Sequence, residues 1–416
     1  MRERRFTLRE LCRILRSRAE VYDLLGDTER SKADLERALA LADGAGDRLE
    51  RAHCQEELAV LLSGSLEGPL ALSLYGEALQ EFRALGERSG ACDTLVSLAW
   101  VHFHNGDLEP ALRCDEEALA LALDLGDRAR QASAYNTLSH IHGRRGDHAR
   151  AAGATERASA LFRELGDSFG LSLVLNHLGR QAYEMGRWEE AEARYEEARL
   201  LRRQIGWRQG EASILYSLGL LALRRGTLPL SQEHFEASLQ IYQSTGFTQG
   251  EADALHGLGE VLHAAGEADW AARLLESEME IRHRLRDSGG EAQALLAWGE
   301  VLAEGREPGR AEEVLPVARN LAREVERPDL AAQADILSSC LLARAGRNEE
   351  ARGVLESALA AFRGQSHRWE GARAYYRFGR ALGGEKGRPY LEKAKALFLE
   401  IEAGGWADLC ERAMNP

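Results

Sequence analysis

Clustered histidines are the side chains in this sequence that come nearest to metal chemistry. His102 and His104 lie two residues apart, and His140, His142 and His148 form a second group. A protein metal site needs three or four ligands that converge on one point. No cysteine or carboxylate stands at a matching spacing beside these histidines, so we interpret them as solvated or packed side chains. The sequence predicts neither a metal nor another cofactor.

Motifs for catalysis are equally scarce. The sequence lacks the glycine-rich phosphate loop that ends in Gly-Lys-Ser or Gly-Lys-Thr, and it lacks the His-Glu-x-x-His pair of zinc proteases. No strand is expected, so no serine nucleophile elbow can form at the end of one. No acid, base and nucleophile stand in a recognisable arrangement. We therefore expect a protein that is not an enzyme.

Composition and charge argue against several other classes. The formal net charge is −14, whereas proteins that bind nucleic acids or anionic lipids usually carry a basic surplus. No run of about 18 apolar residues could span a membrane, and the segment Met1–Thr7 has no apolar region of a secretory signal. Six scattered cysteines suit reduced thiols in the cytoplasm. We expect a cytoplasmic protein with no nucleic-acid or membrane partner.

A repeat of 40 residues dominates the chain. Its first glycine set is Gly26, Gly106, Gly146, Gly186, Gly226, Gly266 and Gly346. A second set is offset by 20 residues: Gly46, Gly86, Gly126, Gly166, Gly206 and Gly246. Two turn positions in each repeat imply two helices in each repeat. Prolines just after the first turn mark where second helices begin, since proline is tolerated in a first helical turn: Pro69, Pro110, Pro229, Pro308 and Pro389.

Small side chains keep the same period. One column runs Ala19, Ala59, Ala99, Ser139, Gly179, Gly219, Gly259, Gly299, Ser339 and Gly379. Small residues let two helix backbones approach closely, so this column predicts where the two helices of each repeat cross. Leucines at helical spacing flank the column, as at Leu175 and Leu178. The pattern predicts an all-α array of paired helices.

The unit Leu175-x-x-Leu178-Gly179, followed by Gly186-x-x-x-x-Ala191 and Tyr195-x-x-Ala198, resembles the tetratricopeptide repeat (TPR). The resemblance recurs about ten times and covers nearly the whole chain. The unit of 40 residues is longer than the usual repeat and resembles the arrays of large bacterial signalling regulators. The resemblance implies an all-α, right-handed α-solenoid of about ten helix-turn-helix units.

We expect one solenoid over residues 1–416. Its units are framed at about 12–51, 52–91, 92–131, 132–171, 172–211, 212–251, 252–291, 292–331, 332–371 and 372–403, with a capping helix at about 404–414. In the eighth unit Pro316 lies inside the second helix, and Pro328 stands near the place of a turn glycine. An interior proline kinks a helix. We therefore expect a bend or hinge at 305–330, with a local kink absorbed by packing as the alternative.

The resemblance also implies that the first helix of each unit lines a concave groove that contacts the partner. The matching positions are Trp100, His104, Asn136, His140, Arg144, Asn176, Arg180, Tyr216, Arg224, His256 and Glu260. These columns change residue type between units, unlike the leucine and alanine columns of the core. Asparagine can bond both groups of a peptide backbone, arginine binds carboxylates through a fork of donors, and Trp100 and Tyr216 offer large contact areas.

We therefore expect a non-catalytic scaffold or sensor that binds a protein or peptide segment in this groove. A concave face without any partner is the first alternative. The second is a regulatory array of a bacterial signalling ATPase, cyclase or transcription regulator that responds to a small ligand or peptide. Self-association through the ends of the array also stays open.

Overall fold

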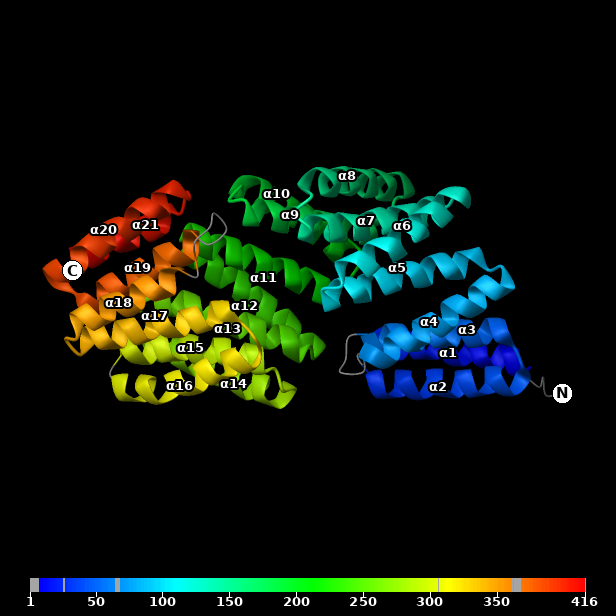
Figure 1. Cartoon of the computed structure of the whole chain (residues 1–416), viewed down its shortest axis with the longest axis horizontal. Coiled ribbons are helices and arrows are strands. Elements are labelled where there is room, and N and C mark those ends of the chain that lie inside the picture. Colours follow the sequence, from blue (N-terminus) through cyan, green and yellow to red (C-terminus); the bar gives the residue numbers. More distant parts are fainter. Residues whose placement is uncertain are drawn as a thin grey trace. The chain divides into compact units, whose positions relative to one another are not determined.

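The computed structural model describes residues 7–24, 27–63, 68–305, 307–360, 362 and 368–415. The expected turn at Gly26 and most of the segment Met1–Thr7 lie outside these residues. The described secondary structure is entirely helical, with no strand (Figure 1). The chain divides into two compact units, which we call unit 1 (residues 1–174) and unit 2 (residues 175–416) and describe separately. The predicted all-α solenoid of helix pairs is confirmed.

Helices of similar length follow one another along the chain. Unit 1 contains α1 (Leu8–Leu24), α2 (Thr28–Ala45), α3 (Arg48–Ser63), α4 (Gly68–Leu85), α5 (Arg88–Asn105), α6 (Leu108–Asp124), α7 (Arg128–Arg144) and α8 (His148–Leu165). The division between the units falls inside α9 (Ser168–Glu184). Unit 2 continues with α10 (Trp188–Gln204), α11 (Arg208–Arg225), α12 (Leu228–Thr245), α13 (Thr248–Ala265), α14 (Ala268–Leu285), α15 (Ser288–Glu304), α16 (Pro308–Glu324), α17 (Pro328–Arg344), α18 (Asn348–Ala360), α19 (Arg368–Leu382), α20 (Gly384–Glu400) and α21 (Gly404–Met414).

The turn glycines do what their spacing predicts. Every described member of the two glycine sets has a positive φ, as at Gly226 with φ 78°. In this conformation the amide of Gly226 donates to the carbonyl of Leu223, and the next amide, of Thr227, donates to Ala222, both at 3.0 Å. These bonds satisfy the last carbonyls of α11. Glycine adopts such a φ without the strain that a Cβ atom causes, which explains the period of the glycines.

The column of small residues lies where paired helices cross. A Cβ atom added to Gly179 would stand 2.6 Å from the ring of Tyr195, and one added to Gly219 would stand 2.7 Å from the ring of Phe235. Gly259 faces Leu275 in the same way, at 2.8 Å. The first helix of a pair therefore contacts the second through its backbone, and the large side chain of the second helix fills the crossing.

Prolines mark helix starts with one exception. Pro308 begins α16, and Pro229 lies in the first turn of α12. The expectation for Pro389 is wrong, because α20 begins at Gly384 and Pro389 lies inside it. The chain turns earlier than expected, at Gly383 and Gly384, which have positive φ values of 62° and 49°. The helix α16 runs through Pro316; the bend at 305–330 stays a prediction, and residue 306 lies outside the described residues.

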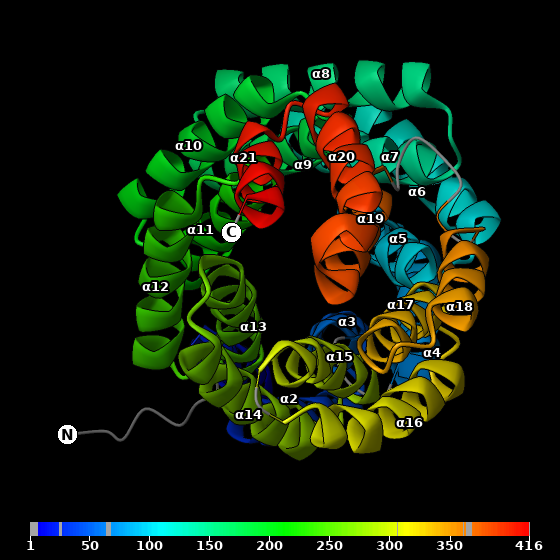
Figure 2. The same ribbon diagram turned by 90° about the vertical axis from the view of Figure 1, so that its left-hand side faces the viewer.

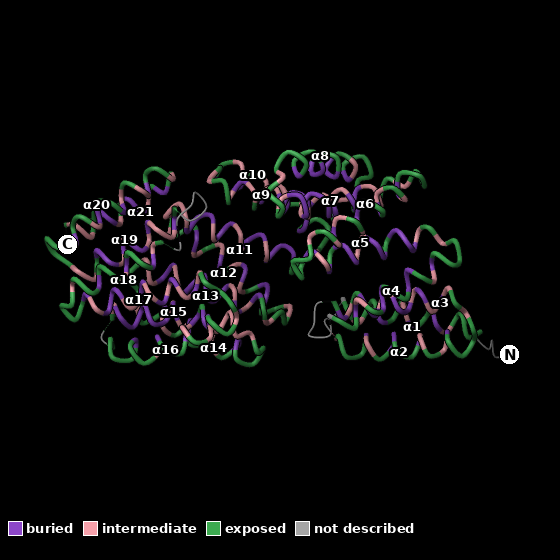
Figure 3. The backbone as a smooth tube through the Cα atoms, viewed as in Figure 1, coloured by how far each residue is buried: buried purple, intermediate pink, exposed green. Residues whose placement is uncertain are grey.

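Odd-numbered helices form the inner row of unit 2. Each of α11, α13 and α15 contacts the next odd-numbered helix, while α12, α14, α16 and α18 form the outer row (Figure 2). Exposed residues follow the outer sides of helices such as α14 and α16, and buried residues lie where helices meet (Figure 3). In unit 1, α1, α3, α5 and α7 contact one another in the same way. The first helices therefore line the concave face of each unit.

The last three helices of unit 2 lie inside its arc. Figure 2 shows α19, α20 and α21 within the curve of α11 to α18, and α21 contacts α11. Trp406 packs with Leu223, Leu258 and Phe398 in one apolar cluster. Backbone meets backbone where Gly405 approaches Gly226: a Cβ atom on Gly405 would stand 2.4 Å from the carbonyl oxygen of Gly226. The C-terminal helices thus cover the concave face that the earlier helices of unit 2 form.

Candidate functional site

The predicted groove residues of unit 1 gather around one tryptophan. The ring of Trp100 on α5 lies 4.5 Å from the ring of His104 and 5.3 Å from the ring of His140 on α7. The guanidinium of Arg144 stands 5.2 Å from the centre of the Phe103 ring, which is itself 5.7 Å from Trp100. We call these five side chains the unit 1 cluster. Trp100 is 40% exposed, which is high for so large an aromatic side chain.

Other predicted groove residues in this region have capacity for a partner. The side-chain oxygen Oδ1 of Asn136 is buried and accepts no hydrogen bond. Arg144 and Arg180 are exposed, and neither forms an ion pair among the described residues. Asn176 is half-buried on α9. The unit 1 cluster and Asn136 therefore belong to unit 1, whereas Asn176 and Arg180 belong to unit 2.

The situation changes farther along unit 2, where α19 crosses the concave face. Three arginines on one side of α19 form ion pairs with glutamates of α13 and α15. Arg373 pairs with Glu260 at 2.8 Å, Arg377 pairs with Glu300 at 2.5 Å, and Arg380 pairs with Glu304 at 2.8 Å. The first two pairs and Glu304 are largely shielded from solvent, whereas Arg380 is exposed. The chain itself therefore engages Glu260, which the sequence analysis assigned to a partner.

A stack of aromatic rings and guanidinium groups adds to this contact. Arg224 lies 4.8 Å from the ring of Tyr183 on one side and 4.8 Å from the ring of Trp369 on the other. It also donates to Glu370 of α19 at 3.1 Å. The guanidinium of Arg373 also lies 4.5 Å from the centre of the same Trp369 ring. Cation–π contacts of this kind stabilise most where solvent is excluded.

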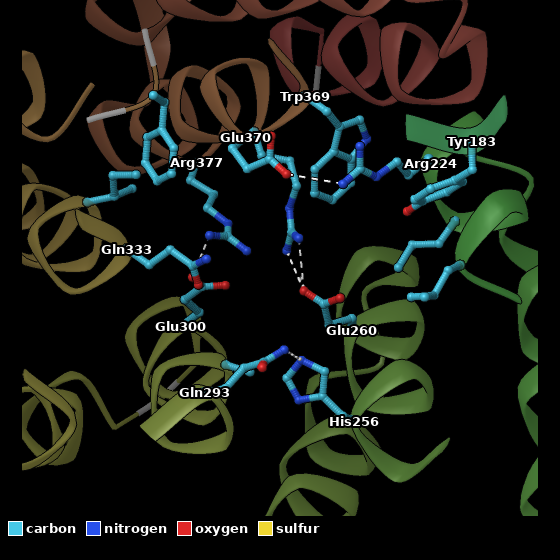
Figure 4. Close-up of a pocket in the computed structure, with 16 residues that line it drawn as sticks. Tyr183, Arg224, His256, Glu260, Gln293, Glu300, Gln333, Trp369, Glu370 and Arg377 are labelled. Atoms are coloured by element: carbon cyan, nitrogen blue, oxygen red, sulfur yellow. Dashed lines mark hydrogen bonds and ion pairs between the residues drawn. The ribbon is translucent and has the colours of Figure 1, made fainter. Parts of the chain in front are cut away.

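A cavity of about 180 Å³ remains beneath α19. Side chains from α11, α13, α15, α17 and α19 converge on it in Figure 4. The polar and aromatic lining residues are Tyr183, Arg224, His256, Glu260, Gln293, Glu300, Gln333, Trp369, Glu370, Arg373 and Arg377. We call this space the unit 2 cavity.

Glu260 is held ionised at the unit 2 cavity. Burial alone would raise the pKa of Glu260, but Arg373, His256 and Arg377 outweigh burial and lower the pKa to about 2. The pKa of Arg377 is lowered by burial and by the neighbouring charge of Arg373. An arginine nevertheless keeps its proton near neutral pH. The charges of Arg373 and Glu260 are therefore paired by direct contact beside the cavity.

His256 is also charged in this setting. Its Nδ1 lies 2.9 Å from an oxygen of Glu278. Burial disfavours the imidazolium, but Glu278 outweighs burial and raises the pKa of His256 to about 9. Nε2 lies 3.0 Å from the nitrogen Nε2 of Gln293. Because a protonated imidazole donates through both nitrogens, the charged form requires the Gln293 amide to be turned by 180°, so that its oxygen accepts and its NH₂ remains a donor.

The structure thus divides the predicted groove residues into two groups. The first comprises Trp100, His104, Asn136, His140, Arg144, Asn176 and Arg180, on α5, α7 and α9. The second comprises Tyr216, Arg224, His256 and Glu260, on α11 and α13, and three of these line the unit 2 cavity. Tyr216 instead packs beside Phe235, with 5.4 Å between ring centres, and burial raises its pKa.

Sequence reasoning missed several residues of the unit 2 cavity. Gln293, Gln333 and Arg373 share one column of the 40-residue repeat, and Arg377 lies four residues farther along α19. Extending the search by this column would have found them. Trp369 and Glu370 precede that column at the start of α19, where no repeat position points to a role.

Comparisons with known proteins agree with this fold. The tetratricopeptide repeat family model matches residues 90–164, 170–244 and 210–284. The predicted resemblance to tetratricopeptide repeats is therefore confirmed over these ranges. No curated protein sequence matches the chain.

Three solved structures illustrate the likeness. The first is a signal transduction ATPase with numerous domains (STAND) that has a tetratricopeptide repeat sensor, from Pyrococcus horikoshii: 14% identity, TM-score 0.61, 92% of this chain and 55% of that one. The second is the Rap conjugation gene regulator of plasmid pLS20 in complex with the Phr* peptide, with 12% identity and a TM-score of 0.58; the match covers 80% of this chain and 94% of that one. The third is the apo quorum sensor NprR from B. thuringiensis, with 13% identity and a TM-score of 0.57; the match covers 82% of this chain and 98% of that one. At these identities the likeness concerns the fold alone.

Two further findings concern the expectations about metals and membranes. In the described part of the chain no group of three or more histidine, cysteine, aspartate or glutamate residues could hold a metal ion. No described helix has the length and apolar character to cross a membrane. All six cysteines are free thiols. The cytoplasmic location stays a prediction.

Proposed function

We propose that the chain is a non-catalytic scaffold or sensor that binds a protein or peptide segment on the concave face of unit 1. The exposure of Trp100 is the observation that carries the proposal. A tryptophan that is 40% exposed on a concave face, with histidine rings packed against it, suits a binding anchor. The corresponding face of unit 2 is covered by α19, so a segment has more room in unit 1.

The charges of the unit 1 cluster suggest what such a segment contains. Arg144 has an exposed guanidinium without an ion-pair partner among the described residues, and such a group pairs well with a carboxylate. We therefore expect an extended segment that carries an acidic side chain near Arg144 and an apolar side chain on Trp100.

The structural comparisons lend limited support. One similar structure is described as a complex with a peptide, and another as a quorum sensor. Because the identities are 12% and 13%, these descriptions support a sensor or interaction role in general and no particular ligand.

Site-specific photo-crosslinking tests the proposal. A photoreactive amino acid would replace His104, inside the unit 1 cluster, in the cells that produce the protein. Leu123 is the matched control, since it is an exposed residue of α6 in the outer row. We expect a discrete crosslinked polypeptide from position 104 and none from position 123, and we expect Trp100→Ala to abolish it.

The crosslinked segment is then made as a synthetic peptide. Its affinity for the Trp100→Ala protein should be at least about tenfold lower than for the unchanged protein. No crosslink from position 104, or equal crosslinks from both positions, would contradict binding at this face.

A second candidate is the sensor array of a signalling ATPase, cyclase or transcription regulator. Its support is the likeness to the STAND protein, which extends over 92% of this chain. In that case a small ligand, rather than a protein segment, would control the array. Unit 2 offers a place for such a ligand.

A further inference from the structure

The last helices of unit 2 are held in place beside the unit 2 cavity by contacts that involve backbone atoms. Trp406 Nε1 donates to the carbonyl of Leu223 at 2.6 Å, and Trp188 Nε1 donates to the carbonyl of Ile401 at 3.0 Å. Together with the close approach of Gly226 and Gly405, these contacts hold α19 to α21 against the concave face. An extended chain would have to displace a packed core, whereas a small molecule needs only the space that remains.

The charges around the cavity balance. Three arginines and three glutamates line it, and the charge of His256 is matched by Glu278 behind it. A ligand with a net charge would leave one buried charge without a counter-ion, which is costly. A ligand whose own charges cancel preserves the balance.

Several lining groups still lack a hydrogen-bond partner. Glu370 Oε2, an acceptor, and the donors Trp369 Nε1 and Arg373 Nε are buried and unpaired in the described structure. Trp369 is also only 8% exposed. Unpaired buried polar groups cost free energy unless water or a ligand satisfies them. All three atoms belong to residues 369–373 of α19, so unsatisfied donors and an unsatisfied acceptor occur at the same wall of the cavity.

The arginines and the glutamates reach the cavity from different helices. Arg373 and Arg377 lie one helical turn apart on α19, and they contact Glu260 of α13 and Glu300 of α15, respectively. Figure 4 shows Arg377, Glu300 and Glu260 around the cavity. We propose that the unit 2 cavity binds a small zwitterion with one carboxylate and one ammonium group, a free amino acid being the chemical class. The carboxylate lies beside Arg377 and Arg373, and the ammonium group lies beside Glu300 and Glu260.

Electrostatics at Arg377 agree with this orientation. Burial and the neighbouring charge of Arg373 lower the pKa of Arg377, against the opposing effects of Glu300 and Glu260. A carboxylate of the ligand beside Arg377 would act in the same direction as these two glutamates and favour the charged guanidinium. The site does not depend on the segment-binding role proposed for unit 1.

Size sets a limit on the ligand. A volume of about 180 Å³ has room for on the order of ten non-hydrogen atoms, since one water needs roughly 10–15 Å³ on the same measure. Free amino acids fall in this range. Gln293 and Gln333 line the remaining wall with amide groups that can bond a polar side chain of the ligand.

Isothermal titration calorimetry on the full chain tests the proposal. Each of the common L-amino acids would be titrated, and each binder would be compared with its carboxamide, which lacks the carboxylate, and its N-acetyl form, which lacks the ammonium group. We expect one site per chain for at least one amino acid, and at least about tenfold weaker binding of both derivatives. Absence of binding by every amino acid at about 10 mM would overturn the proposal, as would equal binding of either derivative.

Variants locate the site. The paired exchange Arg377→Gln with Glu300→Gln removes both charges together and so leaves no unpaired one, and Gln333→Leu alters the wall without touching a charge. Each should weaken binding at least about tenfold. Arg380→Gln is the matched control, because Arg380 lies on α19 outside the cavity lining and pairs with Glu304. Circular dichroism confirms folding, and binding that is unchanged in both cavity variants would place the ligand elsewhere and overturn the assignment.

Discussion

Arg373 donates to one oxygen of Glu260 through both terminal nitrogens, at 2.8 and 2.9 Å, although 113 residues separate the two in the sequence. This contact joins α19 to α13 across the concave face of unit 2. Helix α19 thus lies on the concave face that the earlier helices of unit 2 form. The space that remains on this face is the unit 2 cavity.

Loss of either Glu260 or Arg373 should destabilise the protein, because the remaining partner keeps an unpaired charge. Glu260→Gln or Arg373→Gln leaves one charge shielded and unpaired, which we expect to lower the free energy of unfolding by about 3 kcal/mol. The double variant removes both charges and should recover most of that loss. Urea denaturation of the four proteins gives the coupling energy between the two positions.

Arg347→Gln provides a matched control for this cycle. Arg347 and Glu350 form an exposed pair on the surface of unit 2, and such pairs contribute about 1 kcal/mol or less. If the double variant is no more stable than the single ones, the Arg373–Glu260 contact is not a coupled pair.

Acid should weaken unit 2 through its shielded glutamates. Arg373, His256 and Arg377 lower the pKa of Glu260 to about 2 against the effect of burial, and His263 and Arg380 do the same for Glu304. Both pKa values lie below the ordinary 4.5, so the stabilisation is complete above pH 4.5 and is lost as the pH falls toward 2. Thermal unfolding across this range should show the loss, with a flatter profile for Glu304→Gln. An unchanged profile in that variant would contradict the assignment.

Asp115 should destabilise unit 1 at neutral pH. It is fully buried, and neither carboxylate oxygen has a hydrogen-bond partner of normal geometry among the described residues; the backbone of Leu138 gives it only a weak favourable contact. Burial, with a smaller effect of Glu116, raises the pKa of Asp115 well above its ordinary value. The folded state thus favours the protonated acid, so stability falls as the pH rises from about 4 through the raised pKa.

Asp115→Leu should remove this cost. The same repeat column holds Tyr75, Tyr195 and Phe235, so an apolar side chain suits the position. We expect unfolding at pH 7 to require about 1–3 kcal/mol more than in the unchanged protein. Glu116→Gln, at an exposed neighbouring position, should change the stability little. A destabilised Asp115→Leu protein would show that the carboxyl group has a favourable role in the core.

Arg286 occupies a turn position where the preceding repeats, from Gly46 to Gly246, use glycine. It has a φ of 55° and ends α14 in the left-handed conformation. A side chain with a Cβ atom is strained there. Arg286→Gly should raise the free energy of unfolding by about 1 kcal/mol, measured by chemical denaturation. Gly246→Ala, at the equivalent turn of the preceding repeat, should have the opposite effect, and equal effects in both variants would exclude backbone strain as the cause.

Much of the local structure was predictable from the repeat. Glycine at Gly226 and small residues at Gly179 and Gly219 are required by a turn with positive φ and by close helix crossings, which involve residues near in the chain. The candidate site was predictable in part. The repeat columns that contain Trp100 and His256 were predicted from the sequence. The sequence did not predict which residues of these columns stay exposed and which are covered by α19.

The sequence by itself determined the helix pairs, their turns and their crossings, because these depend on contacts within one repeat or between neighbours. Only the tertiary structure decided that Arg373 meets Glu260 and that Arg224 meets Glu370, 146 residues away. The physical reason is curvature: small rotations between successive helix pairs add up along unit 2 until its last helices reach its first. The size of each rotation depends on how side chains pack at the interface between two helix pairs. It therefore cannot be read from the spacing of residue types in the sequence.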